Sequence, residues 1–234
     1  MTITYRTDLT VSLDDSMGSD AKVIRMAKAS IKKTGAAMDQ AAREGFINFL
    51  VRERHGVPFE HIAMTFYIEA PIMVWRQLVK HRHSSISEAS GRYVELEPVF
   101  YSPSPARKLV QVGKPGAYVF EYGTVDQLAD VEESVRSTAE HAWTEYQHLL
   151  KQGVAREIAR SVLPVNIYTS GYVTINARSL MNLLSLRTAG RENATIVSHP
   201  QHEVELLAEG MERHFANLFP ATYAAFEKHG RVAP

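Results

Sequence analysis

The stretch HIAMTFYIEAPIMVWRQLVKHRH, residues 61–83, changes its pattern twice. Residues 61–70 alternate between apolar and polar side chains, as in a β-strand with one buried face. Pro71 suits the first turn of a helix, so we predict a helix from Pro71 to about Lys80. A basic run, residues 80–83, follows directly. The stretch therefore predicts a strand and a helix in the core, and a cluster of cations where the chain leaves it.

The rest of the chain combines long helical patterns with a few strands. We expect further strands near residues 10–13 and at 166–175. Hydrophobic periodicity predicts further helices at residues 19–33, 38–54, 125–151, 154–162 and 176–187, and one or two more within residues 200–228. Prolines and glycines between residues 83 and 118 indicate loops with short extended pieces. No repeat or proline-rich linker divides the sequence, so we predict an α+β fold with a single domain, residues 1–234.

Composition excludes several classes of protein. The 234 residues are 45% hydrophobic, enough to bury a full core. Lys plus Arg equals Asp plus Glu at 26 each, so no net field attracts nucleic acid or a membrane. No apolar segment approaches the roughly 20 residues that span a bilayer, and the first residues lack a signal-peptide pattern. We expect a cytoplasmic protein with neither nucleic acid nor membrane as partner. The absence of cysteine excludes a thiol nucleophile.

Positive charge is concentrated at the end of the helix predicted from Pro71. Arg76 and Lys80 are four residues apart, so both project from one helix face with Gln77 beside them. Like charges at this spacing repel mildly, and the basic run adds to them. A bound polyanion such as a phosphate explains this excess of charge. The alternative is the solvated face of an amphipathic helix.

A metal site is another explanation for the histidines. His81 and His83 form an H-x-H pair, and Glu88 could supply the third ligand that zinc needs. The permanent charges of Lys80 and Arg82 oppose the binding of a dication beside them. We therefore expect no metal at this position.

Glu88, Ser90 and Arg92 alternate along the next segment, so an extended backbone would point all three side chains the same way. A carboxylate, a hydroxyl and a guanidinium on one edge suit a ligand with a phosphate, donors and acceptors. Gly91 would let the backbone approach such a ligand closely. An ordinary serine-rich loop is the alternative.

A second polar set lies in the C-terminal half. Arg160 is on a predicted helix that Pro164 ends. In NARSLMNLLSLR, residues 176–187, Asn176 can cap the helix, Arg178 and Asn182 share a face, and Arg187 is at the end. Core packing explains the leucines of this helix, but it does not explain the polar residues interleaved with them.

Three separated blocks of the sequence match one family. KHRHSSISEASGR, residues 80–92, resembles the signature R-H-R-x-x-S-x-N-E-x-S-x-R of the flavin-dependent thymidylate synthases. The match continues in HGVPFEHIAMTFYIEAPIMVWRQLVKHR, VLPVNIYTSGYVTINARSLMNLLSLR and HPQHEVELLAEGM, so it extends from about residue 20 to 228. Two positions depart from the signature, because Lys80 replaces an arginine and Ser87 replaces an asparagine. Lys80 keeps the charge but loses the bidentate fork of arginine.

The resemblance implies a fold and a reaction. The fold is α+β, with a mostly antiparallel central sheet flanked by long helices, and the assembly is a homotetramer whose active sites share residues between subunits. The reaction is reductive methylation of dUMP to dTMP, with methylenetetrahydrofolate as carbon donor, NADPH as reductant and FAD as redox mediator. The lack of cysteine agrees with this class, because the flavin supplies the chemistry that a thiolate supplies in the unrelated class.

The resemblance also implies roles for individual residues. The expected FAD contacts are Ser30, His55, Lys80, His81, Arg82, Ser87, Glu88, Asn176, Arg178 and Asn182. The expected dUMP contacts are Arg76, Gln77, Glu88, Ser90, Gly91, Arg92, Arg160 and Arg187. Two of these residues are expected to be catalytic. Arg187 would stabilise negative charge on the uracil ring, and Ser90 would donate a hydrogen bond to the nucleotide without acting as a covalent nucleophile.

Two other functions stay open at this point. The departures at Lys80 and Ser87 leave room for a catalytically impaired relative that binds flavin or nucleotide. The basic run could also belong to a nucleic-acid-binding module. Zero net charge and the lack of a basic surface interleaved with aromatic residues disfavour that second alternative.

Overall fold

The structure is a computed structural model that describes residues 2–31, 38–115 and 117–234. The chain forms two compact units, each assembled from three segments. Unit 1 comprises Met1–Leu9, Glu69–Gln77 and Glu88–Gly171, and unit 2 comprises Thr10–Ile68, Leu78–Ser87 and Tyr172–Pro234. The interpretation of residues 1–234 as a single domain stays a prediction.

A four-stranded sheet has the strand order β2-β3-β8-β4 and is mostly antiparallel. Its strands are β2 (Thr10–Met17), β3 (Ala63–Pro71), β8 (Tyr168–Asn176) and β4 (Ser84–Glu88). The alternation expected for residues 61–70 is present, because every second residue of β3 from Met64 to Ala70 is buried. On the other face, the Thr65 and Thr174 hydroxyls are 2.9 Å apart. The α+β fold with a mostly antiparallel sheet is confirmed.

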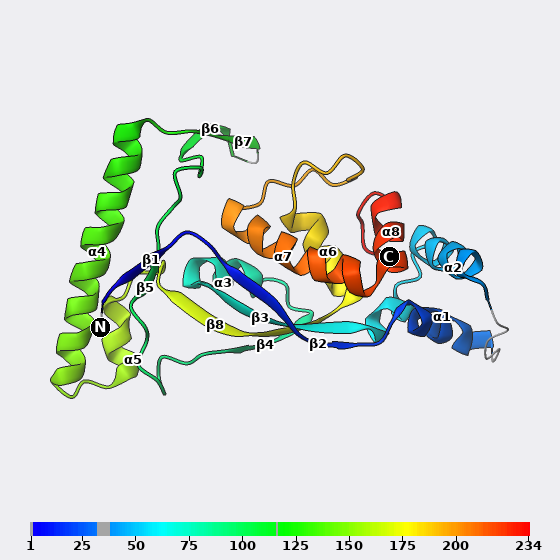
Figure 1. Cartoon of the computed structure of the whole chain (residues 1–234), viewed down its shortest axis with the longest axis horizontal. Coiled ribbons are helices and arrows are strands. Elements are labelled where there is room, and N and C mark those ends of the chain that lie inside the picture. The colour runs from blue at the N-terminus through cyan, green and yellow to red at the C-terminus, as the bar shows by residue number, and fades with distance from the viewer. Residues whose placement is uncertain (1, 32–37, 116) are drawn as a thin grey trace. The chain divides into compact units, whose positions relative to one another are not determined.

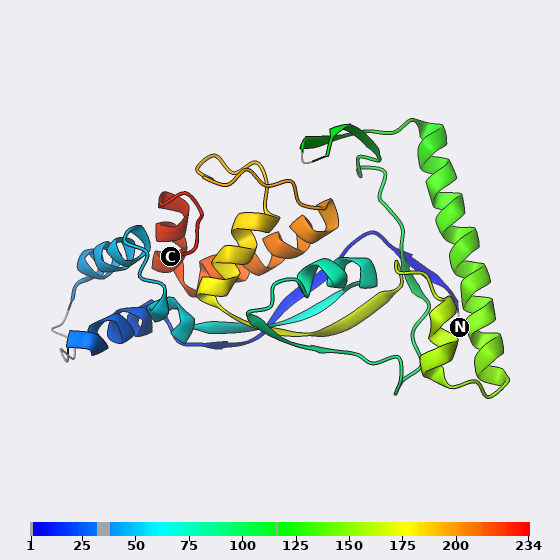
Figure 2. The same cartoon turned by 180° about the vertical axis from the view of Figure 1, so that it is seen from behind.

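Unit 2 contains five of the α-helices that the structure describes: α1 (Asp20–Lys28), α2 (Gln40–Arg52), α6 (Ala177–Arg187), α7 (His202–Leu218) and α8 (Pro220–Lys228). Figures 1 and 2 show α6 and α7 side by side, and the two helices are in contact. The N-caps of α2 and α6 are side-chain oxygens: Asp39 accepts a hydrogen bond from the Ala42 amide at 2.8 Å, and Asn176 accepts one from the Ser179 amide at 2.8 Å. The cap predicted at Asn176 is confirmed.

Unit 1 is organised around the long helix α4 (Val125–Lys151), whose bounds match the prediction. Thr124 and Gln127 form a capping box at its start. The short helix α5 (Arg156–Ala159) contacts α4, and both views show the two together. Trp143, Tyr146, Phe100 and Ile167 form the buried core of this unit. The smaller sheets pair β1 (Thr4–Arg6) with β5 (Val99–Tyr101) and β6 (Val110–Lys114) with β7 (Ala117–Glu121).

The helix predicted from Pro71 to about Lys80 differs from the observed one. Helix α3 spans Ile72–Leu78, because pairing extends β3 through Pro71 and the chain turns after Leu78, where the His81 amide donates to the Leu78 carbonyl. Lys80 is therefore outside the helix, and the prediction that it shares a helix face with Arg76 fails.

The part of the first predicted helix at residues 32–33 lies outside the described residues.

Residues 89–92 form a loop, which is the alternative to an extended segment with Glu88, Ser90 and Arg92 pointing the same way. Strand β4 ends at Glu88, and the amides of Tyr93 and Val94 then donate to the Ser90 carbonyl, which bends the chain into a turn. Glu88, Ser90 and Arg92 therefore do not continue one strand.

Within the described residues, no helix combines the length and the apolar character needed to cross a membrane.

Two helical glycines give a matched test of packing. A Cβ on Gly210 of α7 would come within 2.8 Å of the Val11 Cβ, whereas a Cβ on Gly45 of α2 would meet nothing within 4 Å. We expect Gly210→Ala to lower the free energy of unfolding by about 1–3 kcal/mol through overpacking. We expect Gly45→Ala to raise it by up to about 1 kcal/mol, because alanine favours the helix. Urea denaturation measures both, and equal shifts of the same sign would contradict this account of the α7–β2 contact.

Candidate functional site

A cavity of about 720 Å³ in unit 2 brings together two segments that are far apart in the sequence. The turn after α3 contributes Lys80, His81, Arg82 and His83, and the β8–α6 segment contributes Asn176, Arg178, Asn182 and Arg187. Glu60 is the only carboxylate side chain among its lining residues. Its size is within the range of small-molecule and cofactor sites, and its lining favours an anionic ligand.

The leucines of helix α6 are buried in the core, so the polar residues on its opposite face line this cavity. Leu180 and Leu184 are fully buried and Leu183 is 1% exposed. Arg178 and Asn182, four residues apart, are exposed on the cavity side. The sequence pattern that core packing left unexplained therefore has a structural reason.

Arg178 is held firmly at the start of α6. Its Nη1 atom lies 2.5 Å from a Glu60 carboxylate oxygen, and its Nε atom donates to the Pro234 carbonyl at 2.7 Å. Gly56 packs against this guanidinium, because a Cβ there would come within 2.6 Å of both the Arg178 Cζ atom and the Pro234 oxygen. Glycine is therefore required beside Arg178, and residues 233–234 form part of the cavity wall.

Arg187, at the end of α6, contacts an imidazole instead of a carboxylate. Its Nε–H donates to His81 Nε2 at 3.0 Å, so His81 is the acceptor and carries its own proton on Nδ1. Burial, together with the charge of Arg187, lowers the pKa of His81 to about 4. Burial also lowers the pKa of Arg187. Because the His81 ring is neutral, this contact does not compensate the positive charge of the half-buried Arg187 guanidinium.

A second cavity, of about 410 Å³, lies in unit 1. Glu88, Gly91 and Arg160 line it together with apolar side chains such as Ile72 and Leu163. A Cβ on Gly91 would come within 3.2 Å of the Arg160 Cδ atom, so the glycine leaves room for the stem of that arginine. The cavity therefore combines two carboxylates, Glu88 and Glu157, and one guanidinium with a largely apolar wall.

Ser90 and Arg92 adjoin this cavity in the sequence but do not line it. The Ser90 hydroxyl oxygen accepts a long hydrogen bond of 3.3 Å from the Arg92 amide, and Arg92 Nε lies 2.8 Å from Glu157. That ion pair is about half exposed on both sides and is worth little. Arg76 is exposed on α3, and Gln77 is partly buried there. Neither lines either cavity.

The structure thus brings together only part of each predicted set. Six expected FAD contacts line the cavity of unit 2: Lys80, His81, Arg82, Asn176, Arg178 and Asn182. Ser30, His55 and Ser87 also belong to unit 2 but are exposed outside this lining, and Glu88 belongs to unit 1. All expected dUMP contacts belong to unit 1 except Arg187. The described residues contain no group of three or more histidine or acidic side chains arranged to hold a metal ion.

Sequence reasoning missed several residues of the cavity wall. Glu60 and the residues Ala233–Pro234 line it, and Arg54 also holds this segment by donating to the Ala233 carbonyl at 3.0 Å. Arg54 has a positive φ of 61°, which is uncommon for a residue with a side chain. No local motif marks these contacts, because each joins segments that are distant in the sequence.

The fold is α+β, and the cationic lining of the unit 2 cavity suits an anionic organic ligand. Residues 12–221 match the family described as thymidylate synthase complementing protein. The flavin-dependent thymidylate synthases of Tropheryma whipplei and Streptomyces coelicolor are each 48% identical to this chain, covering 98% and 99% of it and 97% and 96% of their own lengths. The chain therefore belongs to the flavin-dependent thymidylate synthases, a family of enzymes.

A solved structure extends the comparison to the whole fold. The UMP/dUMP methylase PolB from Streptomyces cacaoi, bound with 5-Br dUMP, has a TM-score of 0.94 at 47% identity and covers 99% of this chain and 100% of its own. The same protein bound with 5-Br UMP gives a TM-score of 0.92 at 46% identity, with 99% of each chain covered. The family resemblance read from the three sequence blocks is confirmed.

The contact between His81 and Arg187 gives a pH-dependent test. We expect NMR of histidine-labelled, flavin-free protein to show that His81 titrates near pH 4 and is neutral at pH 6. In Arg187→Gln the His81 pKa should rise, because a positive charge is removed, but not reach its ordinary value, because burial is the larger cause. A His81 pKa near 6.5 in the unmodified protein would contradict the contact.

Proposed function

We propose that this protein catalyses the reductive methylation of dUMP to dTMP, with methylenetetrahydrofolate as carbon donor, FAD as redox mediator and NADPH as reductant. One observation carries the proposal: the half-buried guanidinium of Arg187 faces a cationic cavity and contacts a neutral imidazole. Membership of the flavin-dependent thymidylate synthases supports it. The sequence has no cysteine, so a thiolate cannot activate the uracil ring.

The residues of the unit 2 cavity fit a flavin dinucleotide. Lys80 and Arg82 supply charge for a pyrophosphate, although Lys80 does so as a point charge without a planar fork. The amides of Asn176 and Asn182 supply donors and acceptors for a polar ring edge. Asn176 has already committed its Oδ1 atom to the α6 cap, so its NH₂ group is the part available to a ligand. Bound FAD would supply the hydride chemistry.

The protein's own part is binding and electrostatic stabilisation. The uracil carbon that accepts the one-carbon unit becomes a nucleophile only when negative charge builds up across the ring. A fixed guanidinium beside the ring carbonyls stabilises that charge in the transition state. Arg187 has this role in the proposal. Glu88, Ser90, Gly91, Arg92 and Arg160, with Arg76 and Gln77, are proposed to hold the nucleotide.

We also propose that the protein is a homotetramer and is located in the cytoplasm. Ser30, His55 and Ser87 are exposed and lie outside the cavity lining, as expected if they contact a ligand bound mainly by another subunit. A site shared between subunits would also explain why the predicted residues divide into two sets.

Release of tritium from dUMP labelled at uracil C5 tests the function and the role of Arg187. We expect the FAD-loaded protein to release tritium and form dTMP. Arg187→Gln should lower the rate about a hundredfold or more, because one charge-stabilising donor is lost, while the flavin absorbance of the purified protein is retained. Flavin binding without tritium release in the unmodified protein would instead indicate a catalytically impaired relative, and near-normal turnover in Arg187→Gln would refute the assigned role.

UMP is a second candidate substrate. The relative from Streptomyces cacaoi is a UMP/dUMP methylase with solved complexes of both brominated nucleotides, and it matches this chain over 99% of its length. UMP differs from dUMP by one added hydroxyl, on the ribose. A binding site discriminates only weakly against a ligand with an added hydroxyl, unless binding that ligand leaves a buried polar group unpaired. The same tritium assay with labelled UMP, alone and in competition with dUMP, decides between a dUMP-specific enzyme and one that accepts both.

Ser90 is proposed to assist dUMP binding through a hydrogen bond, not through a covalent bond. A serine hydroxyl is a weak nucleophile without an adjacent general base, and the polar contact of the Ser90 oxygen is to the Arg92 amide. We expect Ser90→Ala to retain measurable dTMP formation with a raised KM for dUMP. Complete inactivity with dUMP and FAD binding intact would overturn this role, as would a Ser90–uridylate adduct detected by mass spectrometry.

A further inference from the structure

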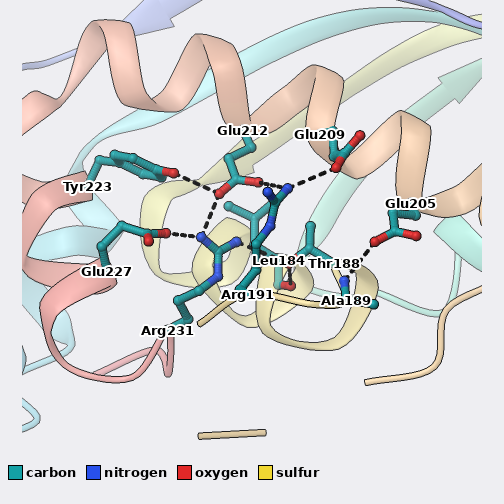
Figure 3. A network of polar contacts seen from close by, with 10 residues as sticks. All are labelled: Leu184, Thr188, Ala189, Arg191, Glu205, Glu209, Glu212, Tyr223, Glu227 and Arg231. Atoms are coloured by element: carbon teal, nitrogen blue, oxygen red, sulfur yellow. Dashed lines mark hydrogen bonds and ion pairs between the residues drawn. The ribbon is translucent and has the colours of Figure 1, made fainter. Parts of the chain in front are cut away.

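A buried arginine near the C-terminal end is the centre of a polar network in unit 2 (Figure 3). The Arg231 side chain is only 2% exposed. Its Nη1 atom lies 2.7 Å from a Glu212 carboxylate oxygen and also pairs with Glu227. Its Nη2 atom donates to the Thr188 hydroxyl at 3.0 Å. A buried charge is costly unless it is paired and hydrogen-bonded, so these three partners account for an arginine at this position.

Glu212 links this arginine to the rest of the network. Its side chain is 8% exposed, and it accepts hydrogen bonds from Tyr223 at 2.9 Å and from Arg191 at 3.4 Å. Arg191 also pairs with Glu209 at 2.9 Å. Figure 3 shows these side chains converging between α7 and the segment that follows α6. The carboxylates come from helices α7 and α8, so they provide fixed anchors for both arginines.

The network holds the chain immediately after Arg187. The Thr188 hydroxyl accepts from Arg231 and donates to the Leu184 carbonyl at 2.7 Å in the last turn of α6. The next residue is also held, because the Ala189 amide donates to Glu205 at 2.7 Å. The backbone on the C-terminal side of Arg187 is therefore fixed by side chains of α7 and by Arg231.

The same arginine fixes the segment that forms part of the cavity wall. Gly230 and Arg231 have positive φ angles of 78° and 53°, and the second is disfavoured for a residue with a Cβ. The Thr195 amide donates to the Gly230 carbonyl at 2.9 Å, which joins this turn to the 188–200 loop. Beyond Arg231 the chain continues to Pro234, whose carbonyl accepts from Arg178. Arg231 thus connects both ends of α6 to one buried anchor.

We propose that Arg231 is a positioning residue for Arg187: through the Thr188 hydroxyl and the Glu212 carboxylate, it fixes the end of α6 so that the Arg187 guanidinium stays against His81 in the cavity. This inference rests on the proposed function for its effect on catalysis. Its structural part, the position of Arg187, can be measured whether or not the protein forms dTMP.

Thr188→Val is the most selective test. Valine keeps the branched shape but removes the hydroxyl that joins Arg231 to α6, and it leaves the pairs of Arg231 with Glu212 and Glu227 in place. We expect the NMR pKa of His81 to rise in Thr188→Val and in Arg231→Gln, because Arg187 is no longer held beside the ring. In the Arg187→Gln background, Thr188→Val should cause no further change. This non-additivity identifies coupling through Arg187.

Activity of the FAD-loaded protein gives the second measurement. We expect kcat for dTMP formation to fall about tenfold in Thr188→Val, since small misplacements of a catalytic group carry large costs, with retained flavin absorbance. Arg213→Gln removes an exposed arginine from the same helix α7 and is the matched control, expected to change neither the His81 pKa nor kcat. If Arg231→Gln does not fold, Thr188→Val decides the question.

The outcomes separate this inference from the proposed function. An unchanged His81 pKa in Thr188→Val would overturn the positioning role, as would an equal effect in the presence and absence of Arg187. A shifted His81 pKa in a protein that forms no dTMP would support the positioning of Arg187 and count against the proposed function alone.

Discussion

The hydrogen bond from Arg187 to His81 is the interaction on which the candidate site depends. It requires a neutral imidazole with Nε2 as acceptor, and burial beside a permanent cation keeps the ring neutral. An aspartate or glutamate in the same place would orient the guanidinium as well, but it would also neutralise the charge. A histidine that cannot easily protonate therefore orients the arginine and preserves its charge for the ligand.

The rest of unit 2 can be understood as support for this geometry. The apolar face of α6 is buried, and its start is capped by Asn176. Its end is fixed through Thr188 to the buried Arg231 and Glu212. Because side chains hold both ends of the helix, the polar residues between them are presented at set positions. Buried ion pairs are weak evidence for stability, and specific orientation is the better explanation for this network.

The sequence predicts the periodic elements well and the long-range contacts poorly. Helix α4 was predicted to the residue, and the strand at 61–70 and the α6 cap at Asn176 were found, because alternation, helical periodicity and capping are local signals. The turn at residues 79–82 was missed, since it depends on hydrogen bonds that compete with the local pattern. Basic residues 80–83 and the polar face of α6 were recognised as unusual. Their meeting with Glu60 and Pro234 in one cavity needs the folded chain, as does the pairing of Arg231 with Glu212.

A crystal structure of the FAD-loaded protein with dUMP would show directly which atoms Arg187 contacts. We expect that the Arg187 Nε–H still donates to His81, and that the terminal nitrogens of Arg187 lie within hydrogen-bonding distance of the carbonyl or imide atoms of the uracil ring. An Arg187 guanidinium that pairs with a carboxylate, or that contacts only a phosphate while the uracil ring lies elsewhere, would refute the role assigned to Arg187.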